Sequence, residues 1–104
     1  MQRGEVWWAR LPTPAGLRPV VHLTRNSAYA NRTHATVAPL TRSGRPIASH
    51  VLVGPEEGLP QPSVINLDDI QTMPMAQLVR QITTLSDERM RDVDKAIKYA
   101  LAIP

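Results

Sequence analysis

The feature that most constrains this chain is its division into short apolar runs, each bounded by proline, glycine or clusters of small polar residues. Runs of about four to eight residues rich in valine, isoleucine and threonine are typical of β-strands and are too short for most helices. We therefore expect strands over residues 5–11, 18–25, 34–41, 47–53, 63–67, 70–73 and 79–85. Residues 26–32 and 74–78 should form loops or single helical turns, and residues 54–62 a loop.

One helix is expected, at the C-terminal end of the sequence. Ser86 is a favourable N-cap, and Asp87 and Glu88 suit the positive end of the helix dipole. Leu85 and Met90 occupy the two positions of a hydrophobic staple. An apolar stripe at helical spacing, interpreted as core or dimer contact, consists of Met90, Val93, Ile97, Ala100 and Leu101.

Short strands with turn signals and one terminal helix predict a mainly β fold with a C-terminal helix, in the form of a small, strongly bent antiparallel barrel. At 104 residues we expect one domain over residues 1–104, with a single modest core. No apolar run approaches the ~20 residues that span a bilayer, and residues 1–6 lack the apolar core of a signal peptide, so we expect a cytoplasmic protein. The absence of cysteine excludes disulfides, thiol catalysis and thiolate metal sites.

Basic charge is concentrated in the first half of the chain. Residues 1–45 hold seven arginines and one acid, for a formal charge of +6, whereas residues 46–104 hold five basic and eight acidic residues, for −3, which together give +3. Arginine's planar guanidinium suits phosphate groups better than lysine's point charge does. This asymmetry predicts a polyanionic partner, nucleic acid first, with a compositional bias towards arginine as the alternative.

Two expected strand ends carry polar side chains. Residues 17–23 form a β-branched apolar run with Arg18 at its start, and Pro19 fits the first residue or the edge of a strand because it cannot donate to a sheet ladder. A second run, residues 37–41, ends in the hydroxyl of Thr41. Junctions between strands and loops are common places for a rigid scaffold to present functional groups.

The adjacent tryptophans Trp7 and Trp8 must face opposite ways if residues 5–11 form a strand, because side chains alternate. We expect one in the core and the other on a second packed face or exposed. An exposed indole could stack on a nucleobase, although packing between subunits of a dimer is the favoured explanation.

Four blocks together resemble the MazF/PemK family of toxin endoribonucleases: Arg3-Gly4-Glu5-Val6-Trp7, Gly16-Leu17-Arg18-Pro19-Val20, Val37-Ala38-Pro39-Leu40-Thr41 and Leu85-Ser86-Asp87. Their order and spacing match the family from end to end, although each block alone is weak. The resemblance implies an SH3-like barrel with a C-terminal helix, working as a homodimer. It also implies metal-independent, sequence-specific cleavage of single-stranded RNA, without a cofactor, by the toxin of a type II toxin–antitoxin system that a MazE-like antitoxin inhibits.

The resemblance also implies site residues. Arg18 and Thr41 match the family's usual catalytic pair, and Asp68 is retained from a block that commonly reads Asp-Gln-Ile-Arg-Thr. In that block Asp69 and Gln71 depart from the family, which leaves base preference open. The residues expected to contact RNA are Ser43, Arg42, Arg25, His50 and Arg45.

RNA supplies its own nucleophile, the 2′-hydroxyl, so the protein mainly needs to hold the backbone and stabilise charge. We expect Arg18 to neutralise the pentavalent phosphate and Thr41 to bind a phosphate oxygen, giving 2′,3′-cyclic phosphate and 5′-hydroxyl ends. Arginine stays protonated and makes a poor general base. Asp68 or a histidine could serve as the base, and the histidines show no metal-ligand spacing.

Two other functions stay open. Gyrase-poisoning toxins resemble the nuclease family in fold but act through a C-terminal tail ending in Trp-Gly-Ile, whereas this sequence ends Leu101-Ala102-Ile103-Pro104. A small-barrel RNA-binding protein with a decayed catalytic site is the third possibility, which Asp69 and Gln71 favour and the retained Arg18 and Thr41 oppose.

Overall fold

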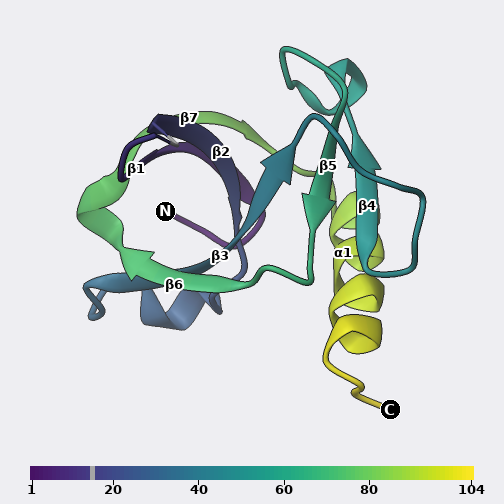
Figure 1. Cartoon of the computed structure of the whole chain (residues 1–104). Coiled ribbons are helices and arrows are strands. Elements are labelled where there is room, and N and C mark those ends of the chain that lie inside the picture. The colour runs from purple at the N-terminus through teal and green to yellow at the C-terminus, as the bar shows by residue number, and fades with distance from the viewer. Residues whose placement is uncertain (15) are drawn as a thin grey trace.

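The computed structural model describes residues 1–14 and 16–104 and consists of a curled antiparallel sheet followed by one helix (Figure 1). Short 3₁₀ turns at Asn26–Ala28, Pro55–Glu57 and Met75–Gln77 connect some of the strands. The strands are β1 (Glu5–Leu11), β2 (Gly16–His22), β3 (His34–Thr41), β4 (His50–Val53), β5 (Ser63–Asn66), β6 (Gln71–Pro74) and β7 (Leu78–Thr84), and the helix is α1 (Asp87–Ala100).

The seven-stranded sheet has the order β4-β5-β3-β2-β1-β7, with β6 also paired to β3. β3 is forked, because residues 34–37 pair with β6 whereas Leu40 and Thr41 pair with β5. The 3₁₀ turn Met75–Gln77 leads from β6 directly into β7, so the strands β7-β1-β2-β3-β6 curl into a ring (Figure 1). This arrangement is the small bent barrel that the short strands predict, with α1 beside β4 and β5.

Strands β1, β2 and β3 are buried on both faces. One cluster, inside the ring, includes Ala9, Val20 and Val37. The other lies between the opposite face of these strands, β4, β5 and α1, and includes Val21 and Ile65. A strand covered on both sides reads as a continuous apolar run instead of an alternating one, which explains the uninterrupted valines of β2.

The helix begins as predicted. The Ser86 hydroxyl accepts a hydrogen bond from the Arg89 backbone N–H at 3.1 Å, and the staple residues Leu85 and Met90 are both buried in the cluster beside α1. Leu101 follows the last helical turn and is 56% exposed, so it is not part of the core, and its expected alternative role as a dimer contact stays a prediction.

Two strand predictions have the wrong length. Residues 47–49 are not part of β4, because they form a turn in which the His50 N–H donates to the Ile47 carbonyl at 3.0 Å. β2 ends at His22 instead of residue 25, since Arg25 caps the following 3₁₀ turn. The other strands agree with prediction to within about one residue, the usual uncertainty of such boundaries.

No helix in the described part of the chain is both long and apolar enough to cross a bilayer.

Candidate active site

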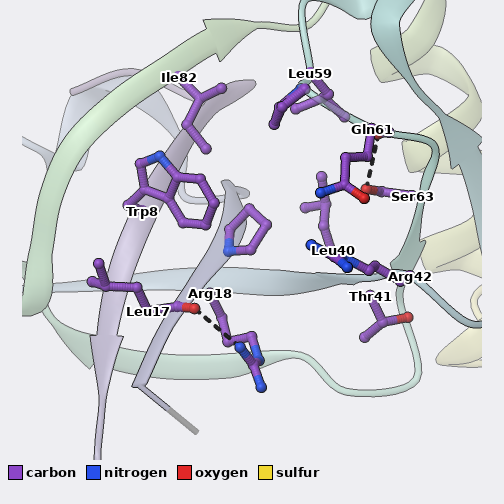
Figure 2. A pocket seen from close by; sticks show the side chains of 12 residues that line it. Trp8, Leu17, Arg18, Leu40, Thr41, Arg42, Leu59, Gln61, Ser63 and Ile82 are labelled. Atoms are coloured by element: carbon purple, nitrogen blue, oxygen red, sulfur yellow. Dashed lines mark hydrogen bonds between the residues drawn. The ribbon is translucent and has the colours of Figure 1, made fainter.

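A cavity of about 630 Å³ opens where β2 begins and β3 ends (Figure 2). Most of its lining is apolar, with an arginine on each of two neighbouring segments. Its lining residues are Trp8, Leu17, Arg18, Pro19, Leu40, Thr41, Arg42, Leu59, Pro60, Gln61, Ser63 and Ile82. It therefore joins the two strand ends that the sequence singles out.

The register of β2 and β3 explains why Arg18 and Thr41 meet. The last paired residues are Val20 and Pro39, and the same register carried two residues further places Arg18 opposite Thr41. Neither Pro19 nor Pro39 has a backbone N–H to donate, so the ladder ends here and the strands separate. Both side chains then line the gap between the strands.

Hydrogen bonds shape the polar side of the cavity. The Thr41 hydroxyl donates to the Ser43 carbonyl at 2.8 Å, which turns the chain sharply after β3. Arg18 is exposed, and its Nη1 donates at 3.2 Å to the carbonyl of its neighbour Leu17.

The cavity is electropositive. Among the described residues, ion pairs involve Arg3 and Arg89 but neither Arg18 nor Arg42, and the described lining contains no carboxylate. Two guanidinium groups without a counter-charge favour an anion between them.

The far wall is a loop fastened to β7. The Thr83 hydroxyl donates to the Glu57 carbonyl at 2.9 Å, and Gly58 takes a φ of +91° against Thr83, where an added Cβ would lie 2.5 Å from the Thr83 Oγ1. Leu59 is buried directly after this contact. Gln61 follows, and its carbonyl accepts from the Ser63 hydroxyl at 3.2 Å (Figure 2). The close approach at Gly58 thus fixes the position of the wall.

The two tryptophans face opposite sides of β1, as alternation requires. Trp7 packs against the cluster inside the ring, donates its indole N–H to Glu5 Oε1 at 2.8 Å and meets the His22 ring edge-on at 6.1 Å. Trp8 instead lines the cavity, on the side opposite Ser63 and Arg42 (Figure 2). An aromatic surface therefore lies in the same cavity as the arginines.

Other predicted site residues lie outside this lining. Asp68 is in the turn after β5, where its Oδ2 accepts from the Ser49 hydroxyl at 2.6 Å. His50 lines a separate cavity of about 440 Å³ between β4 and α1. Arg25 precedes the 3₁₀ turn beyond the other end of β2, whereas Ser43 and Arg45 lie on the exposed connection that follows Arg42.

The two departures from the family block bind each other. Gln71 Nε2 donates to Asp69 Oδ1 at 3.0 Å, at an exposed position outside the described cavity lining. The altered pair is therefore a local surface contact in this chain.

His22 is part of the core. It is fully buried, its Nδ1 lies 3.1 Å from the Tyr29 hydroxyl, and its Nε2 has no partner among the described residues. Burial lowers the pKa of His22 from 6.5 to about 4, so the ring is neutral at pH 7. Among the described residues, no group of three or more His, Asp or Glu side chains could hold a metal ion.

The sequence did not identify the wall opposite Arg18. The sequence predicts residues 59–61 only as part of a loop, and no periodic signal marks which loop residues turn inward. Ile82 enters the lining because of a β-bulge: Val6 pairs with Thr83 and Trp7 with Gln81, which leaves Ile82 as the extra residue. Register shifts of this kind depend on the fold and leave no local sequence pattern.

Comparison with known proteins agrees over nearly the whole chain. Residues 2–101 match the family of the PemK-like, MazF-like toxin of type II toxin–antitoxin systems. A probable endoribonuclease MazF5 of Mycobacterium tuberculosis is 39% identical over 100 residues, covering 95% of this chain and 91% of that protein. The structure of the Mycobacterium tuberculosis toxin MazF-mt6 has a TM-score of 0.88 at 36% identity, covering 96% of this chain and 98% of that chain. A mycobacterial endoribonuclease in complex with its cognate antitoxin shares the fold, with a TM-score of 0.90 at 24% identity over 100% of this chain and 97% of that one.

Proposed function

Because this chain belongs to the family of PemK-like, MazF-like toxins of type II toxin–antitoxin systems, we propose that it is the toxin of such a pair and acts as an endoribonuclease on single-stranded RNA. The observation that carries the proposal is the cavity in which Arg18, Thr41 and Arg42 meet without any described carboxylate. An anionic substrate fits such a site, whereas a cation or a basic peptide would need carboxylates, which the described lining does not contain.

The chemistry follows from the groups in the cavity. The 2′-oxygen attacks the adjacent phosphorus while the bond to the 5′-oxygen breaks, which leaves a 2′,3′-cyclic phosphate and a 5′-hydroxyl. Negative charge grows on the phosphate oxygens in the transition state, and a fixed Arg18 guanidinium stabilises it most when it grows. The Thr41 hydroxyl, at the matching position on β3, turns from the Ser43 carbonyl when RNA binds, donates its one proton to a phosphate oxygen and aligns the attack.

Proton transfer is assigned to water. The described lining contains neither a carboxylate nor an imidazole, and arginine stays protonated at any working pH. The bases expected from the sequence, Asp68 and His50, lie outside this lining, so we propose that water at the exposed Arg18 side takes the 2′ proton and returns one to the 5′-oxygen. This route requires no metal ion.

The assembly proposed is a homodimer in the cytoplasm, neutralised by an antitoxin. The electropositive cavity predicts that the inhibitory segment of that antitoxin is acidic and flexible, ordering as it covers Arg18 and Arg42. Covering the cavity would exclude RNA and explain inhibition without any change in the toxin.

The test is cleavage of a long single-stranded RNA by purified protein in EDTA, with analysis of the new ends. We expect cuts at one short motif with cyclic phosphate ends, and none with Arg18→Ala. No cleavage by the folded protein, with any RNA tried, would refute the nuclease proposal. A gyrase assay would then test the binding-inhibitor function.

A further inference from the structure

A second hollow adjoins the cavity on the other side of Trp8. Its volume is about 550 Å³, and it is lined by Trp8, Leu17, Val79 and Arg80. Trp8 and Leu17 belong to both linings, so the two hollows adjoin at these residues, over β2, β1 and β7. Nothing in the proposed cleavage step uses this second part.

The register of three strands builds this hollow. Trp8 pairs with Pro19 on β2 and with Arg80 on β7, so these side chains share one face of the sheet. A β-bulge follows, because Ala9 pairs with Leu78 and leaves Val79 as the extra residue. A bulge can re-aim a side chain, which brings Val79 to the same hollow as its neighbour Arg80.

The surface is apolar, exposed and flanked by positive charge. Leu17 is 46% exposed and Val79 is 47% exposed. Trp8 lies between two hollows, one of which is also lined by Arg18 and the other by Arg80, its partner on β7. The described lining of this hollow has no carboxylate, and no ion pair among the described residues includes Arg80.

We propose that this hollow is a nucleobase subsite, in which the base next to the cleaved phosphate stacks on Trp8 while Arg80 holds the following phosphate. The proposal rests on the nuclease function proposed above. A flat aromatic surface between two cations fits the alternation of base and phosphate in a single strand. An apolar peptide would leave both guanidinium groups unpaired, and a second copy of the chain would need acidic groups to meet them.

The two tryptophans allow a direct test with fluorescence. The probe is a 2′-O-methyl copy of the shortest RNA that the protein cleaves, which lacks the nucleophile and stays intact. In Trp7→Phe the remaining emission comes from Trp8, and in Trp8→Phe it comes from Trp7. We expect the probe to quench the first variant in a saturable way and to leave the second almost unchanged.

Affinity gives the second readout. Trp8→Leu should weaken probe binding about 5- to 150-fold, the range for loss of one stacked base, and raise KM with little change in kcat. Arg80→Ala should weaken binding and lower the slope of log Kd against log salt by about 0.7, as expected for one lost phosphate contact on a single strand. Arg91→Ala, an exposed arginine on α1, is the matched control and should bind like wild type.

Each remaining outcome is decisive. If Trp8→Leu and Arg80→Ala are folded and bind the probe like wild type while cleavage persists, the subsite is refuted and the nuclease function stands. If Trp8 emission depends on protein concentration but not on the probe, the hollow is a protein contact and the subsite is wrong. If the protein cleaves no RNA and binds no single strand, the proposed function itself fails.

Discussion

The two ends of β2 belong to one strand of seven residues, but one end is buried and the other is exposed. At its end, Val21 and His22 are fully buried, and the imidazole is packed between Trp7 and Tyr29. At its start, Leu17 and Arg18 are exposed and face the cavity. The buried end can fix the strand in place because both its faces are covered, and the open end can present a charge because its ladder to β3 has stopped. Stability and chemistry are thus separated along one strand.

The largest expected effect tests the open end alone. Arg18→Ala should lower kcat for RNA cleavage by about 10²–10³-fold, because it removes a fixed positive charge from the transition state. The free energy of unfolding should change by less than about 0.5 kcal/mol, since the side chain is exposed. Single-turnover cleavage and urea unfolding measure the two quantities. Arg18→Lys, which keeps the charge but not the planar fork, should recover only part of the rate.

The buried end should respond to acid. The folded-state pKa of His22 is lowered to about 4 by burial, whereas its usual value is 6.5. Between about pH 6.5 and pH 4, His22 binds a proton in the unfolded chain but not in the folded chain. The free energy of unfolding therefore has its full value above pH 6.5 and falls as the pH is lowered from 6.5 to about 4. We expect a loss approaching ~3 kcal/mol, measured by urea unfolding at several pH values.

Two variants isolate that contribution. His22→Phe should flatten the pH dependence over this range, and His34→Gln, at an exposed position, should leave it unchanged. An equal acid response in wild type and His22→Phe would show that the buried end of β2 is not the sensor. RNA cleavage by His22→Phe at pH 7 should match that of wild type, which would show that the buried end of β2 contributes to stability and not to catalysis.

A substitution at Gly58, in the loop that forms the far wall of the cavity, should affect stability and RNA cleavage together. Gly58→Ala places a Cβ 2.5 Å from the Thr83 Oγ1 at a φ of +91°, so we expect a loss of about 2 kcal/mol in stability and a raised KM from the displaced wall. Gly16→Ala is the matched control, because Gly16 also has a positive φ, +65°, but a Cβ added there would meet nothing within 4 Å among the described residues. Thermal unfolding and steady-state cleavage should distinguish them, and equal losses would contradict a packing role for Gly58.

The smallest expected effect concerns Thr41. Thr41→Val keeps the shape but removes the hydroxyl, and we expect about a tenfold drop in kcat, the value of one hydrogen bond to a charged oxygen. Thr41→Ser should retain most of the rate. Because the hydroxyl also donates to the Ser43 carbonyl at 2.8 Å, the melting temperature of both variants should be compared with wild type. A rate for Thr41→Val equal to wild type would limit Thr41 to shaping the loop.

The sequence predicted β1, β2 and β3 because burial on both faces makes them apolar runs, and the other strands from short runs bounded by turn residues. It predicted α1 from its cap and stripe. Arg18 and Thr41 were accessible through their positions at strand ends together with the family resemblance. The cavity wall from Leu59 to Gln61 could not be predicted from the sequence, because its position depends on the contact between Gly58 and Thr83, which are far apart in the chain. Alternation showed that Trp7 and Trp8 diverge but not which one faces the cavity, since β1 is covered on both sides.

The forked pairing of β3 has a consequence for hydrogen exchange. The same strand closes the ring through β2 and β6 and anchors the layer of β4 and β5, and its last two residues, Leu40 and Thr41, belong to that layer. Opening either half strips hydrogen bonds from β3, so the amide protons of the two halves should exchange through one shared opening event. Partial unfolding of β4, β5 and α1 would therefore also displace Thr41. The cavity should be lost only when the whole fold opens.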